Sequence, residues 1–181
     1  MGNQTARHGA LSLPTTSDHL ALTPDVQGRY PAPFYEPFTT LGWLAGVTRR
    51  IEIGSTVVIL PYRQPVEVAR MAANIDQLSG GRLLFGVGVG WSPQEFAALG
   101  VPFHRRGALT NEYLAALKTL WTNDVASFEG RYVAFRRCTR RRDRCALLIR
   151  RSGSAEPVTR PCAGPSAMVM PGTRTAFDPV G

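Results

Sequence analysis

The sequence predicts an α/β fold in which parallel strands alternate with helices. Between about residues 39 and 121, segments with helical spacing of apolar residues alternate with short apolar runs, at intervals of roughly thirty residues. The run at 56–60 is continuous, which is typical of a strand buried on both faces of a parallel sheet. Together these observations indicate successive βα units with right-handed crossovers.

Three strands are expected, within 9–20, 50–60 and 82–90. The first segment, GALSLPTTSDHL, ends its strand near Asp18. A helix is expected at 39–47, before the second strand, because its apolar residues repeat at helical spacing. Those residues are Leu41, Leu44, Ala45 and Val47.

The helix between the second and third strands has clear ends. Pro65 suits a first helical position, and Ser79, Gly80 and Gly81 stop the helix. The expected buried stripe consists of Val68, Met71, Ala72, Ile75 and Leu78.

After the third strand, the segment SPQEFAALG predicts a short helix at 92–100. Ser92 and Glu95 have the spacing of a capping box, Pro93 takes the first position, and Gly100 supplies a left-handed terminator. A longer helix is expected from about Arg105 to Trp121, followed by an exposed hairpin at 126–135. The inward residues of the longer helix are expected to be Tyr113, Leu114, Leu117, Leu120 and Trp121.

Most of the net charge of +8 belongs to the C-terminal segment. Residues 136–181 contain ten Arg and no Lys against three acidic residues, so the preceding 135 residues are nearly neutral. This segment shows no sustained periodicity and is rich in Arg, Pro, Gly and Ser, which predicts little stable structure. The domain organisation is therefore a folded domain at 1–135 and a disordered or out-of-frame tail at 136–181.

Composition also limits the class of protein. Cys138, Cys145 and Cys162 have neither zinc-site nor disulfide-framework spacing, so no metal site is expected. No apolar run reaches the roughly 18 residues of a membrane span, and the first ten residues lack the apolar core of a secretory signal. A cytoplasmic location is the expectation.

The glycine run GRLLFGVGVGW at 81–91 first suggests a phosphate cradle, but its spacing is GxGxG rather than the GxGxxG of dinucleotide-binding folds. Two interpretations remain. Gly86, Gly88 and Gly90 allow a flat ring or backbone to approach a barrel strand, or they serve close packing inside a narrow barrel.

Several segments together resemble a known family. Residues 48–103, RGALTNEYLAALKTLW at 106–121 and SFEGRYVAF at 127–135 are similar to the bacterial luciferase-like monooxygenases, and most closely to their deazaflavin-dependent actinobacterial oxidoreductases. The upstream SDHLALTP belongs to the same likeness, which runs from about Ala6 to Phe135. The resemblance implies a TIM (β/α)₈ barrel. That fold typically needs about 250 residues, so we expect a partial barrel with three to four parallel strands, from a truncated or frameshifted member.

In such a barrel the chemistry lies at the carboxyl ends of the strands. The resemblance implies that His19 transfers protons and that Asp18 lies against the cofactor, whereas an isolated Asp-His pair would merely cap a loop. Thr56 and Val57 match a place where the family often carries a non-proline cis peptide behind the flavin ring, an ordinary buried strand being the alternative. The expected cofactor-binding set is Asp18, His19, Thr56, Val57, Gly88, Gly90 and Trp91.

Trp91 and the pair Arg105–Arg106 also bear on the substrate. Trp91 stands where some deazaflavin dehydrogenases have an acidic residue, which favours an apolar or aromatic substrate over a sugar phosphate. Arg105 and Arg106 are expected to be solvated or to pair with Glu112 or Asp76, rather than to bind phosphate.

The implied function is hydride transfer between a small organic substrate and the deazaflavin coenzyme F420, with FMN as the alternative. Weak cofactor binding, or none, is expected of this chain alone. The alternatives are a non-catalytic fragment, or a nonspecific binder of nucleic acid or acidic partners through Arg136–Arg151. A homo-oligomer or aggregate through exposed sheet edges is a further expectation, with no specific nucleic acid and no membrane as partners.

Overall fold

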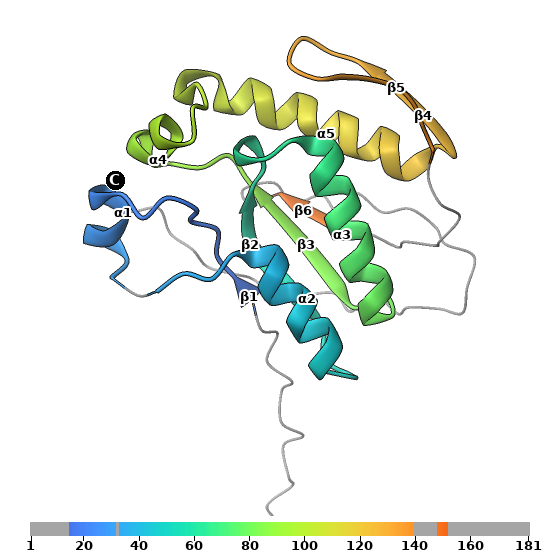
Figure 1. Ribbon diagram of the computed structural model, residues 1–181, viewed down its shortest axis with the longest axis horizontal. Coiled ribbons are helices and arrows are strands. Elements are labelled where there is room, and N and C mark those ends of the chain that lie inside the picture. The colour runs from blue at the N-terminus through green and yellow to red at the C-terminus, as the bar shows by residue number, and fades with distance from the viewer. Residues whose placement is uncertain (1–14, 32, 140–147, 152–181) are drawn as a thin grey trace, which may run out of the picture.

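The computed structural model describes residues 15–31, 33–139 and 148–151. A single four-stranded sheet organises the fold, and all of its neighbouring strands are parallel (Figure 1). Its strands, in spatial order, are β1 (Thr15–Thr16), β2 (Ile53–Ile59), β3 (Leu83–Gly88) and β6 (Leu148–Arg151). This arrangement confirms the α/β class and the parallel sheet.

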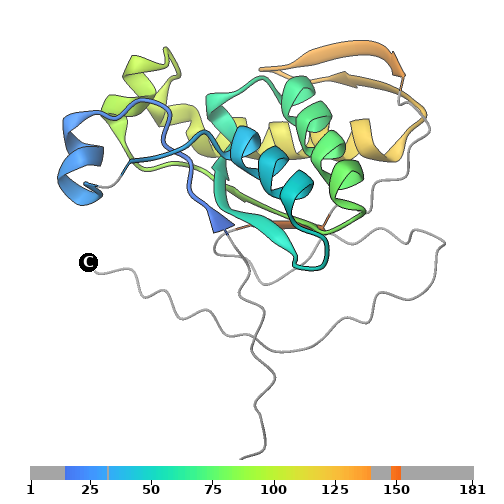
Figure 2. The ribbon, with the colours of Figure 1, turned by 60° about the horizontal axis from the view of Figure 1, so that its bottom comes forward.

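Three helices lie together on one side of this sheet (Figures 1 and 2). They are α2 (Pro37–Val47), α3 (Pro65–Ser79) and α5 (Arg106–Thr122). Their inward side chains form the main core with the odd-numbered residues Leu83, Phe85 and Val87 of β3. Because successive strand residues point to opposite faces, Leu84, Gly86 and Gly88 face the other side of the sheet.

The helix ends match their sequence signals. Pro65 begins α3, and Gly80 and Gly81 end it with φ of 71° and 84°. The prediction that Leu78 belongs to the buried stripe of α3 is wrong. Leu78 is 71% exposed, whereas Val68 and Ala72 are fully buried. The buried face of α3 continues through Ile75, Asp76 and Ser79, so Leu78 lies off this face.

Shorter elements gather beyond the carboxyl end of the sheet. They are α1 (Pro24–Arg29), the 3₁₀ turn Leu60–Tyr62, α4 (Pro93–Ala98) and the 3₁₀ turn Phe103–Arg105. The Ser92 hydroxyl caps α4 by accepting from the Glu95 N–H at 3.0 Å, and Gly100 has φ of 68°. These loops determine what surrounds the strand ends.

The expected hairpin is present as β4 (Val125–Glu129) and β5 (Ala134–Thr139), which pair antiparallel. Its turn is held to α5 by one carboxylate. Glu112 accepts hydrogen bonds from the N–H groups of Arg131, Tyr132 and Val133 at 3.0, 2.6 and 2.9 Å.

Two described strands fall in the segment 136–181, for which little stable structure was expected. β5 continues through Thr139, and β6 pairs with β3 in the register Leu84↔Leu148 to Val87↔Arg151. Residues 140–147 and 152–181 lie outside the described residues, so the division of the chain at residue 135 stays a prediction.

Within the described residues, Cys138 is a free thiol and no group of His, Cys, Asp and Glu is arranged to hold a metal ion. Cys145 and Cys162 lie outside that part of the chain. None of the described helices combines the length and apolarity needed to cross a bilayer.

Candidate site at the carboxyl ends of the strands

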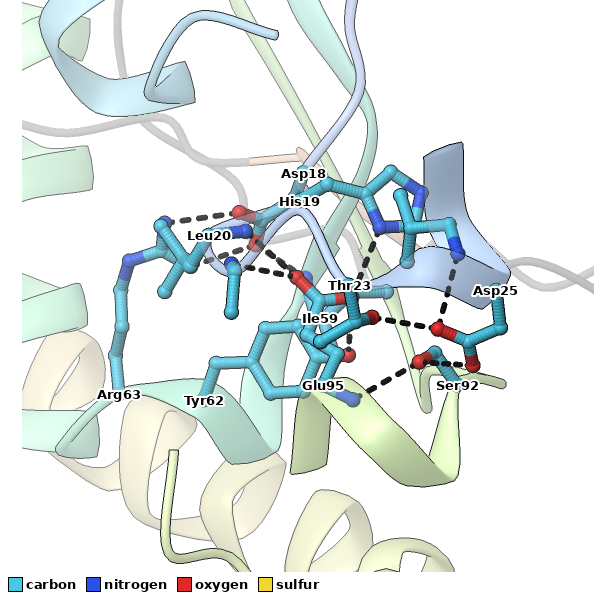
Figure 3. Close-up of polar contacts among 12 residues, drawn as sticks. Asp18, His19, Leu20, Thr23, Asp25, Ile59, Tyr62, Arg63, Ser92 and Glu95 are labelled. Carbon is cyan, nitrogen blue, oxygen red and sulfur yellow. Dashed lines mark hydrogen bonds and ion pairs between the residues drawn. The ribbon is translucent and has the colours of Figure 1, made fainter. Parts of the chain in front are cut away.

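The carboxyl ends of β1, β2 and β3 converge, as expected for adjacent parallel strands (Figure 3). The Asp18 carboxylate accepts from the Ile59 N–H at 2.8 Å, which joins the first two strand ends. The rings of His19 and Trp91 have centroids 5.9 Å apart, and this contact joins the end of β1 to the end of β3. Three of the sequence-predicted segments thus form one cluster.

Asp18 is bound to protein groups inside the fold. Its side chain is 0% exposed, and both carboxylate oxygens bind Arg63, at 2.6 Å to Nη1 and 2.9 Å to Nη2. Burial raises the pKa of Asp18, and the Arg63 guanidinium and the Ile59 N–H act in the opposite direction. The carboxylate is engaged inside the protein and orders the backbone beside His19, and a contact of Asp18 with the cofactor stays a prediction.

Glu95 is the residue that sequence reasoning missed. The capping-box spacing predicts that its side chain returns to the N-terminus of α4, but the completely buried carboxylate points toward the segment after β1 (Figure 3). It lies 2.9 Å from His19 Nδ1 and accepts from the N–H groups of Leu20 and Ala21 at 2.6 and 3.2 Å. These partners are 74 to 76 residues away in sequence, so no local pattern could have revealed them.

Tyr62 completes the arrangement around Glu95. Its hydroxyl donates to Glu95 Oε2 at 2.9 Å, and its ring packs edge-on against Phe96. Burial, together with the neighbouring Glu95 charge, raises the pKa of Tyr62 well above its ordinary value. The phenol therefore stays protonated and acts as a donor.

A second polar link ties α1 to α4. Asp25 accepts from the Ser92 hydroxyl at 2.6 Å and from the Thr23 hydroxyl at 2.5 Å. Desolvation acts to raise the pKa of Asp25, but the hydrogen bonds from Ser92 and Thr23 prevail and lower it. The segment between His19 and α1 is thus held at both of its ends.

The predicted cis peptide is present between Thr56 and Val57 in β2. The strand pairing shifts register between Ser55 and Val58, so β2 bulges here. Thr56 is exposed and Val57 is half-buried, whereas Ser55 and Val58 on either side are buried. The bulge presents a short stretch of backbone and two small side chains next to the strand ends.

The glycines of β3 make room for this bulge. A Cβ on Gly86 would collide with the Ser55 carbonyl oxygen, and a Cβ on Gly88 would collide with the Val57 side chain. At Gly90, where φ is 79°, a Cβ would approach Phe96 to 2.6 Å and Ile59 to 2.8 Å. Close packing is therefore what these contacts support, and direct cofactor binding by Gly88 and Gly90 stays a prediction.

Aromatic side chains surround the ring of His19, whose side chain is only 9% exposed. Tyr30, Phe34 and Trp91 have ring centroids 5.9, 4.9 and 5.9 Å from that of His19. The guanidinium of Arg29 lies 5.2 Å from the centroid of the Trp91 ring. Trp91 is 36% exposed and Tyr30 is 40% exposed, so part of this aromatic cluster faces solvent.

Arg105 and Arg106 have other partners than those expected. Arg105 donates to the Tyr132 hydroxyl at 3.2 Å, and Arg106 donates to the Phe103 carbonyl at 3.1 Å while lying over its ring. The expected pairing with Glu112 or Asp76 is wrong, because Glu112 is committed to the hairpin turn.

The family model for luciferase-like monooxygenases matches residues 19–172. The chain belongs to this family. The matched range extends past Phe135, where the sequence resemblance was expected to stop. Whether the Arg-rich segment is read out of frame stays a prediction, which the coding DNA tests.

Relatives of this luciferase-like chain share its sequence over part of their length. An uncharacterized protein of Mycobacterium tuberculosis is 38% identical over 122 residues, covering 67% of this chain and 42% of its own. The pyrimidine monooxygenase RutA of Escherichia coli is 37% identical over 108 residues, covering 57% of this chain and 27% of its own. The chain thus spans less than half the length of these curated relatives.

Solved structures show the same luciferase-like fold. The monooxygenase RslO1 from Streptomyces bottropensis superposes with a TM-score of 0.61 at 26% identity, covering 75% of this chain and 41% of its own. An F420-dependent secondary alcohol dehydrogenase, in complex with an F420-acetone adduct, superposes with a TM-score of 0.60 at 22% identity. The match covers 75% of this chain and 42% of the dehydrogenase chain. The oxygenating constituent of 3,6-diketocamphane monooxygenase of Pseudomonas putida, in complex with FMN, superposes with a TM-score of 0.58 at 21% identity. The match covers 67% of this chain and 33% of that protein's chain. Together they confirm the luciferase-like TIM-barrel class, here as a partial barrel, and structural neighbours in this fold bind FMN or F420.

Proposed function

We propose that this chain supplies the ring-binding part of a flavin- or deazaflavin-dependent oxidoreductase site, which transfers hydride between the cofactor and a small organic substrate. The observation that carries the proposal is the contact of His19 with Trp91 beyond the ends of β1 and β3, with the Thr56–Val57 bulge in the strand between them. Membership of the luciferase-like family supports it.

The residues present fit a flat tricyclic ring. The exposed Thr56 and half-buried Val57 offer a backing of small side chains, and His19 and Trp91 lie beyond the ends of the neighbouring strands. We propose coenzyme F420 as the cofactor, with FMN as the alternative, because the segments quoted in the sequence analysis resemble the deazaflavin-dependent members of the family. The cofactor would supply the redox chemistry, while the chain's own residues position the reactants and move the proton.

His19 is the residue proposed to exchange a proton with the substrate, since an imidazole can donate or accept one near neutral pH. Its ring lies within the aromatic cluster of Tyr30, Phe34 and Trp91. Those rings favour an apolar or aromatic substrate, because such a molecule gains burial and ring contacts there without stranding a charge.

A titration with coenzyme F420 and with FMN, followed by cofactor fluorescence, tests the proposal. Because the chain spans less than half the length of its relatives, we expect saturable but weak binding, with a dissociation constant above about 0.1 mM. Thr56→Glu should abolish it, because the carboxylate would occupy the exposed position of the bulge.

Thr122→Glu is the matched control, since Thr122 is also exposed but lies at the far end of α5. It should bind like the parent chain. Equal binding by the parent and the Thr56→Glu variant, or no saturable binding of either cofactor, would count against the proposed site.

A further inference from the structure

The Glu95 carboxylate is surrounded by four hydrogen-bond donors. Oε1 accepts from the N–H groups of Leu20 and Ala21, and Oε2 accepts from the Tyr62 hydroxyl and lies 2.9 Å from His19 Nδ1. Backbone N–H groups can only donate, and Tyr62 keeps its proton because its pKa is raised. Both oxygens of Glu95 therefore act as acceptors, which assigns the hydrogen of the His19 contact to Nδ1.

Glu95 is itself held rigidly. It lies in the first turn of α4, which is capped by Ser92, and Ser92 in turn binds Asp25. The adjacent Phe96 is fully buried and packs against both Tyr62 and Phe103. Because the Ser92 cap and the packing of Phe96 hold Glu95 in place, its carboxylate also fixes the orientation of the imidazole that it binds.

The second ring nitrogen of His19 has a different environment. Within the described residues Nε2 has no hydrogen-bond partner, and Figure 3 shows this edge of the ring pointing away from Glu95. With the hydrogen on Nδ1, the neutral ring carries its lone pair on Nε2. The His19 side chain is 9% exposed, and no protein group among the described residues takes up this nitrogen, so it is free to bind a ligand.

We propose that Glu95 is the positioning residue that holds His19 in the Nδ1–H tautomer and thereby makes Nε2 the atom that exchanges a proton with the substrate. The use of Nε2 rests on the proposed function, but the tautomer does not. In the oxidative direction a substrate alcohol loses its carbon-bound hydride to the oxidised cofactor, and its O–H proton forms an N–H bond at Nε2. The product is the carbonyl compound, and Glu95 faces the positive charge that the ring acquires.

Nitrogen-15 NMR of the histidine rings tests the tautomer without any cofactor. The chain has three histidines, His8, His19 and His104, and replacing His8 and His104 by Asn assigns the signals of His19. At a pH where the ring is neutral, we expect Nδ1 of His19 to carry the hydrogen and Nε2 to be unprotonated. A parent protein with hydrogen on Nε2 would overturn the proposal, whatever any variant does.

Glu95→Gln should remove the preference for the Nδ1–H tautomer. The donors around Glu95 bind two carboxylate oxygens, whereas a carboxamide offers them only one acceptor oxygen. We expect the Nε2–H form to become the major one in the folded variant. Glu112→Gln is the matched control, since Glu112 also binds three backbone N–H groups but lies at the hairpin turn, so the His19 signals should not change.

A folded Glu95→Gln protein with unchanged His19 signals would also contradict the proposal. If the cofactor titration fails while the tautomer and its response to Glu95→Gln are as expected, the proposed function is wrong and the assignment of Glu95 stands. The two outcomes are therefore separable.

Discussion

Gly86→Ala is expected to destabilise the protein by about 3 kcal/mol, as measured by urea unfolding. A Cβ at this position would collide with the Ser55 carbonyl oxygen, which is main chain and cannot rotate away. The two strands are also joined here by the Ser55 hydroxyl, which donates to the Gly86 carbonyl at 2.9 Å and accepts from its N–H at 3.1 Å. Relieving the collision would separate β2 from β3 at the bulge.

Gly46→Ala is the control for this substitution. Gly46 is an exposed residue of α2 with no atom within 4 Å of the added methyl group, so alanine should be neutral or stabilise by up to about 1 kcal/mol. If both variants have the same stability, the packing of β3 glycines against the bulge would be refuted.

Asp18→Asn is expected to cost about 3 kcal/mol of unfolding free energy. The amide retains one acceptor oxygen for a site where the carboxylate binds both Arg63 nitrogens and the Ile59 N–H. Arg63 is only 10% exposed, so it would keep a buried charge with a weaker partner. Thermal or urea unfolding of the purified variant measures the loss.

Glu36→Gln removes the other carboxylate that binds Arg63, at 2.9 Å, but its side chain is 38% exposed. Water screens this pair, so the expected cost is below about 1 kcal/mol. Comparable losses in the two variants would show that burial does not distinguish the two contacts.

Local sequence signals predicted most of the fold. The limits of α3 and α4 follow from Pro65, Gly80, Ser92 and Gly100, whose effects act within one helical turn. The convergence of 17–19, 56–59 and 88–91 followed from parallel topology, because carboxyl ends of adjacent strands meet at one edge. The place of the cis peptide came from the family resemblance alone.

What the sequence could not reveal are contacts between distant segments. Glu95 satisfies a capping-box spacing, yet its carboxylate serves His19 and Tyr62 across the site. Likewise, the glycines of β3 are explained by a bulge thirty-one residues earlier in the chain, as the Ser55 and Gly86 hydrogen bonds show. β6 was unexpected because its segment lacks apolar periodicity and pairs only with β3.

The buried charges also clarify how the site is divided. Asp18 and Glu95 are both inaccessible, and each organises backbone at the end of β1, whereas His19 and Trp91 face the aromatic cluster. Selection of a substrate would thus fall to the exposed rings, and the preparation of His19 to the buried carboxylate.

The most direct test of the proposed cofactor position is the set of nuclear Overhauser effects between the ring protons of FMN or coenzyme F420 and this chain. The site described above predicts effects to the methyl groups of Thr56 and Val57 and to the rings of His19 and Trp91. Effects confined to other surfaces, such as the outer sides of α2 and α5, would contradict the assignment of these strand ends as the ring-binding site.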